Sequence, residues 1–191
     1  TAKSYVYDAA GNPTTIGVLT YTYNNANRLT TVLNGASTVA TYKVNALGQR
    51  VQKIAGGVTT RFVYDEQGRL IGEYDDGGAA RQELVWLGDT PVASVRPGAG
   101  GSIAIYPIYT DHLNTPRVIT NQANQVVWEW KTDTFGAGAA NENPGGLGVF
   151  DPGVAGLRQR RVQPGGEREV AEVVGAELGL PALGGGALRG V

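Results

Sequence analysis

The sequence predicts an all-β protein built from repeated β-hairpins, and two features of the chain support this fold class. First, short segments alternate apolar or aromatic residues with polar ones, as in LTYTYN (19–24) and TRFVYD (60–65). Alternation with a period of two is typical of strands that have one covered face. Second, Asp or Asn follows such segments and Gly or Asn comes three residues later, which is typical of tight turns. No amphipathic helix is predicted before residue 150.

Four turn segments share one pattern, which indicates a repeat. An aromatic or aliphatic residue is followed by Asp or Asn, two variable residues, and then Gly or Asn. The Gly or Asn positions are 11, 27, 48 and 68, which lie 16, 21 and 20 residues apart. Self-similarity at about 20 residues predicts a repeat architecture. The four segments are YDAAGN (7–12), YNNANRL (23–29), VNALGQRV (44–51) and YDEQGRL (64–70).

Each repeat can be understood as one β-hairpin. The Asp or Asn side chain bonds backbone amides in the turn, and the Gly or Asn supplies a left-handed conformation that other residues resist. The following Arg-Leu or Arg-Val begins the return strand. A single hairpin is marginally stable in water, so we expect the hairpins to stack and to bury their aromatic faces against each other.

The same pattern continues, with variations, to residue 136. Turns are predicted at Gly88 to Pro91, at Asn114 to Pro116 and at NQAN (121–124). We divide the chain into repeat hairpins over 1–95, a flexible loop over 96–102, a further β-segment over 103–150 and a tail over 151–191.

Composition excludes several kinds of protein. The 191 residues include no cysteine, so disulfides and thiolate zinc sites are absent. The net charge is −1 and no basic patch points to a nucleic-acid partner. No apolar run reaches the roughly 18 residues that a membrane-spanning helix requires. The chain also has no methionine, even at position 1, so we expect it to be a fragment of a longer product.

No metal or cofactor site is predicted. The Asp-x-Asp-x-Asp-Gly pattern of a calcium loop is missing, and DDGG (75–78) predicts a hairpin turn instead. The segment GAGG (98–101) lacks the Lys-Ser/Thr of a phosphate-binding loop. The carboxylates considered for calcium were Asp65, Glu66, Asp75, Asp76 and Asp89.

The segment YTDHLNTPRVIT (109–120) holds the only histidine and is the strongest candidate for catalysis. A general base needs a positioned partner and a substrate group nearby, and the sequence offers only Asp111 beside His112. The alternative is a turn that begins at Asp111, with His112 bonding the backbone of the hairpin. We favour the structural interpretation and keep a hydrolase centred on these two residues as the lesser hypothesis.

The aromatic residues also allow two interpretations. Rings can form a platform for the apolar faces of sugars, or they can pack between hairpins, where each buries about 150–250 Å². Their recurrence at turn entries favours packing. The residues are Tyr5, Tyr7, Tyr21, Tyr23, Tyr42, Tyr64, Tyr74, Trp86, Tyr106, Tyr109, Trp128 and Trp130.

Over about residues 1–150 the chain resembles the RHS/YD-repeat family. The resemblance is carried by YDEQGRL, by WLGDTPVA (86–93) and above all by the 28 residues YTDHLNTPRVITNQANQVVWEWKTDTFG (109–136), similar to the C-terminal end of the RHS core. The signature residues, to which a structural role is assigned, are Tyr64, Asp65, Gly68, Arg69, Leu70, Asp111, His112, Leu113, Thr115, Pro116, Arg117, Trp128, Phe135 and Gly136.

The resemblance implies β-hairpins that spiral into a hollow shell, usually of a bacterial protein that is secreted or displayed at the cell surface. Such shells often enclose a C-terminal toxin, and they are not enzymes apart from self-cleavage in some members. In this chain FDPGVAGL (150–157) departs from the family's Asp-Pro-x-Gly-Leu element, so no cleavage residue is assigned.

The predicted function is therefore a structural shell or scaffold fragment. Its implied partners are the remainder of the shell, an enclosed C-terminal segment and a secretion-system or surface component. The alternative is a surface module that binds carbohydrate or mediates adhesion, with a glycan as partner.

The tail differs sharply in composition from the rest of the chain. Residues 151–191 are rich in Gly and Arg and contain no aromatic residue and no lysine. We expect disorder with one short helix over 166–180, where Val170, Val173, Val174 and Leu178 lie near one helical face. Three origins compete: a variable toxin junction, a divergent end, and translation in a shifted frame, which we favour. The coding DNA decides, because only a frameshift leaves an aromatic-rich continuation in another frame.

Overall fold

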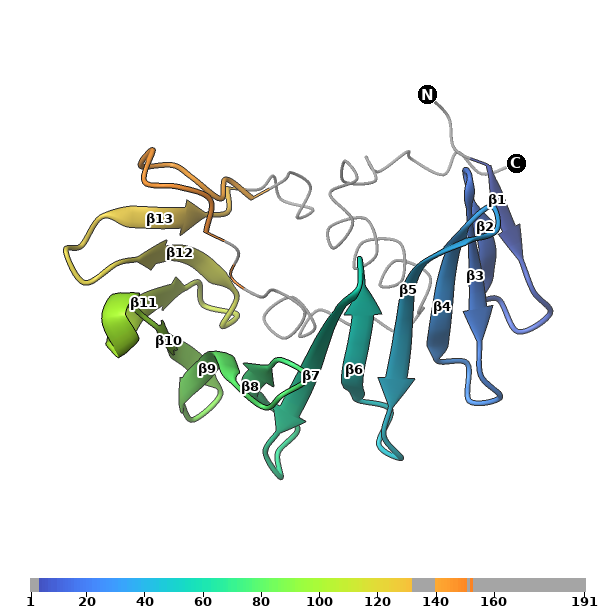
Figure 1. Ribbon diagram of the computed structural model, residues 1–191, viewed down its shortest axis with the longest axis horizontal. Helices are drawn as coiled ribbons and strands as arrows, with labels where there is room; N and C mark the ends of the chain where they lie inside the picture. The colour runs from blue at the N-terminus through green and yellow to red at the C-terminus, as the bar shows by residue number, and fades with distance from the viewer. Residues whose placement is uncertain (1–3, 132–139, 151, 153–191) are drawn as a thin grey trace.

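The structure is a computed structural model that describes residues 4–131, 140–150 and 152, and these form one antiparallel β-sheet. Its thirteen strands are hydrogen-bonded in sequence order, and Figure 1 shows them following an arc from β1 to β13. The predicted all-β fold is confirmed, and the sheet is not closed into a barrel. The strands are β1 (Tyr5–Tyr7), β2 (Pro13–Ile16), β3 (Leu19–Tyr23), β4 (Leu29–Asn34), β5 (Ser37–Val44), β6 (Arg50–Ala55), β7 (Val58–Tyr64), β8 (Leu70–Tyr74), β9 (Ala80–Leu87), β10 (Thr90–Pro97), β11 (Ile103–Thr110), β12 (Pro116–Thr120) and β13 (Val126–Glu129).

The hairpins lie side by side, and not face against face as the expectation of stacking had it. Each hairpin pairs through its backbone with the next one, for example β8 with β9 and β10 with β11. A free strand edge presents unpaired amides and carbonyls, and an adjacent hairpin satisfies them directly. The stacking expectation was therefore wrong in geometry, although the repeats do cover one another's edges.

Among the described residues, one kind of turn occurs seven times. It begins with Asp or Asn, whose side-chain oxygen accepts the amide four residues later, and the amide three residues later bonds the main-chain carbonyl of the same Asp or Asn. The residue at the fourth position has a positive φ, which favours Gly or Asn. The starting residues are Asp8, Asn24, Asn45, Asp65, Asp75, Asp111 and Asn121.

The remaining connections are shorter or glycine-rich. Four hairpins close with two-residue loops whose first residue is a glycine at positive φ, namely Gly17, Gly35, Gly56 and Gly88. The connection between β10 and β11 contains a single 3-10 turn at Ala99–Gly101, fixed by a hydrogen bond from the Gly98 amide to the Ser102 carbonyl. Among the described residues, no helix is long and apolar enough to cross a membrane.

The apolar core lies against one face of the sheet. Strand pairing sets Tyr21 opposite Val32 and Val32 opposite Ala40, which puts all three side chains on that face. The other face exposes Val63 and Val85. The core has two clusters, one of Ile16, Leu19, Tyr21, Val32, Ala40 and Tyr42, and one of Phe62, Leu70, Leu84, Ile108, Ile119, Val127, Trp128 and Phe150.

The described residues after β13 return to the covered face. Asn141 forms a bridge with Glu129 at the end of β13, and Phe150 joins the second core cluster. In Figure 1 this segment, drawn in orange, runs from β13 to the concave side of the arc. The helix expected over 166–180 and the disorder expected for the tail lie outside the described residues.

The open edge at β1 generates a prediction about association. Its outward backbone groups have no neighbouring strand among the described residues, and such an edge is a template for pairing with another chain. We expect the isolated 191-residue chain to associate or precipitate at tens of micromolar, a rough working range for such species. Sedimentation should show this association, and Val6→Lys on β1 should reduce it.

Val63→Lys on the interior strand β7 is the matched control, because it removes exposed apolar surface but changes no edge. A compact monomer in the unmodified chain, or equal effects of the two substitutions, would contradict the edge as the cause.

Candidate functional site

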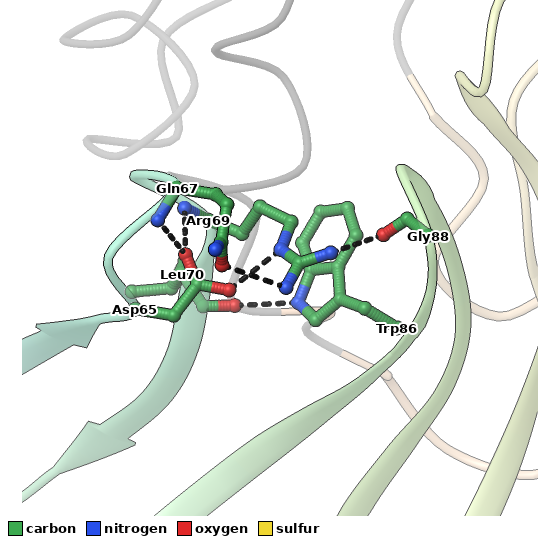
Figure 2. A network of polar contacts seen from close by, with 6 residues as sticks. All are labelled: Asp65, Gln67, Arg69, Leu70, Trp86 and Gly88. Carbon is green, nitrogen blue, oxygen red and sulfur yellow. Dashed lines mark hydrogen bonds and ion pairs between the residues drawn. The ribbon is translucent and has the colours of Figure 1, made fainter.

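The turn at Asp65 shows how the signature residues act together (Figure 2). One carboxylate oxygen of Asp65 accepts the amides of Gln67 at 3.0 Å and Arg69 at 2.8 Å. The other oxygen accepts the Arg69 Nε–H at 2.6 Å. Gly68 occupies the left-handed position with φ of 80°. The polar side chains of this turn therefore close the hairpin.

Burial raises the pKa of Asp65, but the hydrogen bonds from the Arg69 and Gln67 amides and from the Arg69 guanidinium outweigh it and lower the pKa overall. The carboxylate is therefore held in its charged form, in which both oxygens act as acceptors.

Arg69 also connects this turn to the next turn at the same end of the strands. Its Nη1 donates to the carbonyl of Gly88 in the β9–β10 loop, and its guanidinium carbon lies 5.9 Å from the centre of the Trp86 ring. Trp86 in turn donates from Nε1 to the carbonyl of Leu70 at 2.8 Å. Figure 2 shows these contacts closing a network between β8 and β9.

Similar contacts join successive turns at this end of the strands, and we call the series the turn ladder. In most of its steps, the residue that follows the left-handed position reaches the turn of the next hairpin. The contacts are Asn12 Nδ2 to Asn27 Oδ1 at 3.0 Å, the Arg28 guanidinium over Gly48, Gln49 Nε2 over Gly68, Arg69 to Gly88, and Thr90 Oγ1 to Asn114 Oδ1 at 2.8 Å.

In two of these turns, glycine leaves room for the ladder contact. At Gly48 a Cβ atom would lie 2.8 Å from Arg28 Nη2, and at Gly68 one would lie 3.2 Å from Gln49 Nε2. Both glycines also have φ of 80°, where L side chains are strained. Asn27, which occupies the same position, instead uses its side chain as a hydrogen-bond acceptor for Asn12.

Two aromatic residues at turn entries bond to the preceding strand. Tyr23 donates its hydroxyl hydrogen to the carbonyl of Pro13, and Tyr64 donates to that of Arg50, both at 2.9 Å. Burial raises the pKa of Tyr64, which keeps the hydroxyl protonated as a donor. These contacts support the packing interpretation for these rings.

Asp111 begins a turn of the same kind. Its carboxylate accepts the amides of Leu113 and Thr115, at 2.9 and 3.0 Å, and the Nε–H of Arg117 at 2.9 Å. Burial raises the pKa of Asp111, but these hydrogen bonds and the Arg117 charge lower it overall. The Arg117 guanidinium also lies 5.1 Å from the centre of the Trp130 ring.

His112 occupies the second position of this turn and is exposed. No hydrogen bond joins it to any described residue, so the expected bond from His112 to the hairpin backbone is not found. The Asp111 oxygens are engaged by turn amides and Arg117, and this leaves no Asp–His pair of the kind that a general base requires.

The other signature residues are placed by the sheet. Pro116 is buried at the start of β12 and Leu113 is exposed in the turn. Trp128 is buried in β13, and its Nε1 has no hydrogen-bond partner among the described residues. Phe135 and Gly136 lie outside the described residues.

One polar group was missed by reasoning from sequence. Gln82, Ser94 and Arg96 lie on the covered face of β9 and β10 and form hydrogen bonds with one another. A signal was present, because Gln82 alternates with Leu84 and Trp86 in RQELVWL and therefore falls on the apolar face. Among the described residues, no cluster of three or more His, Asp or Glu side chains could hold a metal ion.

Together the sheet and its ladder of turns define a protein that is built from repeated hairpins and carries its polar signature residues in structural turns. The chain matches the Teneurin YD-shell model over residues 3–153 and belongs to that family. The RHS/YD-repeat resemblance is thereby confirmed.

The curated relatives are much longer proteins. The tRNA nuclease WapA of Bacillus subtilis strain 168 and the tRNA3(Ser)-specific nuclease WapA of Bacillus spizizenii are each 38% identical over 65 residues, which is 33% of this chain. The chain spans only 3% of the length of these relatives.

Among solved structures, a crystal structure of TcdB2-TccC3 matches with a TM-score of 0.46 and 19% identity, covering 64% of this chain and 7% of that chain. A Photorhabdus luminescens Tc holotoxin pore with a mutated TccC3 matches with a TM-score of 0.48 and 18% identity, covering 69% and 7%.

The Asp65 turn generates a prediction about stability and pH. Asp65→Ala should lower the melting temperature by roughly 2–5 °C, because two turn amides and Arg69 lose their acceptor. Asp65→Asn should lower it less, since one oxygen still accepts both amides, as it does at Asn24 and Asn45. Thermal unfolding at low protein concentration, followed by circular dichroism, measures both effects.

The sign of the pH effect follows from the lowered pKa of Asp65 in the folded protein. The stability that its charge contributes is present above the unfolded pKa, near 3.9, and is lost as the pH falls through the lower folded pKa. Asp65→Asn should therefore show a shallower loss of stability below about pH 4. Glu66→Gln is the control, and an equal change in that variant would refute the role of Asp65.

His112 generates a separate prediction. His112→Gln should change the melting temperature little, because the side chain is exposed and bonds to no described residue, whereas Asp111→Ala should lower it clearly. No hydrolytic activity should disappear with His112→Gln. If this change abolished turnover on any substrate while circular dichroism stayed native, the structural interpretation would fail.

Proposed function

We propose that this chain is a segment of a curved β-wall in a bacterial YD-shell protein, and that the wall encloses or presents an attached C-terminal segment. The observation that carries the proposal is the covered face of the sheet. It gathers the core aromatic residues, it lies on the side to which residues 140–150 return, and the sheet curves around it (Figure 1).

The physical mechanism is sequestration. A sheet with continuous backbone pairing leaves no gap between neighbouring strands, so a wall of this kind separates the space on its concave side from the surroundings. The turn ladder supports the mechanism because it connects neighbouring hairpins at one end of their strands and resists their separation. Guanidinium groups over rings, such as Arg50 at 4.9 Å from the Tyr42 centroid, add contacts within the wall.

The nature of the attached segment is suggested by the relatives. WapA is named a tRNA nuclease, and this chain resembles only 3% of it. We propose that this chain also belongs to a secreted or surface-displayed toxin-associated protein, with the toxic activity in another part and the wall itself without catalysis. The remainder of the shell and a secretion or surface component are the partners that this function requires.

A second candidate function, glycan binding, has one observation in its favour. Tyr5 and Tyr7 on β1 stack with ring centroids 6.4 Å apart and an angle of 12° between planes, and 43% and 46% of their surfaces are exposed. Exposed, nearly parallel rings of this kind suit the apolar face of a sugar. Binding on a glycan array that Tyr5→Ala and Tyr7→Ala both abolish would favour this function.

The test of the wall function uses a longer protein that carries this chain together with its attached segment. We expect the attached segment to resist protease while the wall is folded. In the double variant Asp65→Ala, Asp111→Ala it should become cleavable at a temperature where the unmodified wall still protects it. The control variant is Glu66→Ala.

Digestion of the attached segment at the same rate in the unmodified protein and in the double variant would rule out enclosure. A segment that is fully accessible in both, together with glycan binding through Tyr5 and Tyr7, would replace the wall function by the adhesion function.

A further inference from the structure

A buried polar group on the covered face of β9 and β10 is the most unusual feature of the second core cluster. Gln82 and Ser94 are each only 2% exposed. The Gln82 Oε1 accepts the Ser94 hydroxyl at 3.0 Å and Arg96 Nη2 at 2.7 Å, and Arg96 Nε donates to Ser94 Oγ at 3.2 Å. Buried polar groups are costly unless they are hydrogen-bonded, so a three-membered group in an apolar cluster calls for an explanation.

The group faces the returning segment of the chain. The Arg96 guanidinium carbon lies 4.1 Å from the centre of the Phe150 ring, well inside cation–π range. Tyr106 on β11 meets the same ring at 4.8 Å between centroids with a tilt of 54°. The Gln82 Nε2 donates to the main-chain carbonyl of Pro152 at 3.0 Å, and both Phe150 and Pro152 are buried.

These contacts recognise two features of one peptide. An aromatic ring contacts both a planar cation and a second ring, and the main-chain carbonyl two residues later accepts a hydrogen bond from an amide. The Gln82 amide links the two, since its oxygen orients Arg96 and its nitrogen bonds the carbonyl. Ser94 holds Gln82 and Arg96 in this arrangement from β10.

We propose that Gln82, Ser94 and Arg96 form a peptide clamp that takes an aromatic residue followed two positions later by a main-chain carbonyl. Its occupant is this chain's own Phe150 together with the main-chain carbonyl of Pro152. The clamp fixes the returning segment to the inner face of β9–β11 and retains it even when its covalent connection to β13 is cut. The inference stands on these contacts and does not require that the wall encloses a toxin.

The experiment cuts the chain between the wall and the occupant. A specific protease site is inserted at residues 135–136 of the full chain, which is attached to beads at low density through an N-terminal tag so that association between copies is avoided. After cleavage, the fraction of the C-terminal piece that stays on the beads is followed over time. We expect the unmodified piece to remain bound, and Arg96→Ala or Phe150→Ala to speed its release about tenfold.

Arg81→Ala is the matched control, because Arg81 is the neighbour of Gln82 on β9 and is exposed on the other face. Its release rate should equal that of the unmodified chain. Arg96→Lys keeps the charge but loses the planar guanidinium, so its release should be intermediate. A synthetic peptide of residues 140–152 should displace the cut piece, and the same peptide with Ala at position 150 should not.

The proposal is overturned if the unmodified piece leaves the beads at once, or if Phe150→Ala is retained as long as the unmodified chain. Phe150→Ala leaves every residue of the wall intact, so it decides the question even where Arg96→Ala prevents folding.

Discussion

The structure depends above all on the hydrogen bonds that an Asp or Asn oxygen accepts from the backbone of its own turn. At Asp65 and Asp111 one oxygen takes two amides, and the left-handed residue that follows reverses the chain. This geometry fixes the register of each hairpin. In a strand with side chains alternating between faces, a slip of one residue would turn every core side chain outward. The turn therefore decides which residues reach the core face, and the core then stabilises the turn.

The turn ladder extends this local constraint along the sheet. A side chain just beyond one turn covers or bonds the next, so neighbouring hairpins are coupled beyond their backbone pairing. The coupling also favours particular residues: the positive φ at Gly48 favours glycine, and a side chain there would have to displace the Arg28 guanidinium. Repeat proteins gain stability from contacts between neighbouring repeats. Here such contacts lie at one end of the strands as well as on the covered face.

The sequence was sufficient to predict the fold class and the positions of the Asp- and Asn-initiated turns, because alternation and turn chemistry are local. It could not show that hairpins join edge to edge, since that depends on which partner satisfies a free strand edge. It missed the ladder, whose contacts span 15 to 24 residues. Gln82 was visible only as a polar residue at an inward position, and its partner Pro152 lies 70 residues away.

The contrast between two polar groups shows where activity in this fold should be sought. In the sequence, Asp111 and His112 resemble a catalytic pair. The Asp111 carboxylate, however, accepts two turn amides and the Arg117 guanidinium, and these hydrogen bonds stabilise the hairpin. Gln82, Ser94 and Arg96 look unremarkable in sequence, yet they stand in the covered face and hold a segment that arrives from elsewhere in the chain. In this repeat the polar side chains of the turns form hydrogen bonds within the turns. Binding of another peptide segment therefore depends on the polar residues that interrupt the apolar pattern of the inner face.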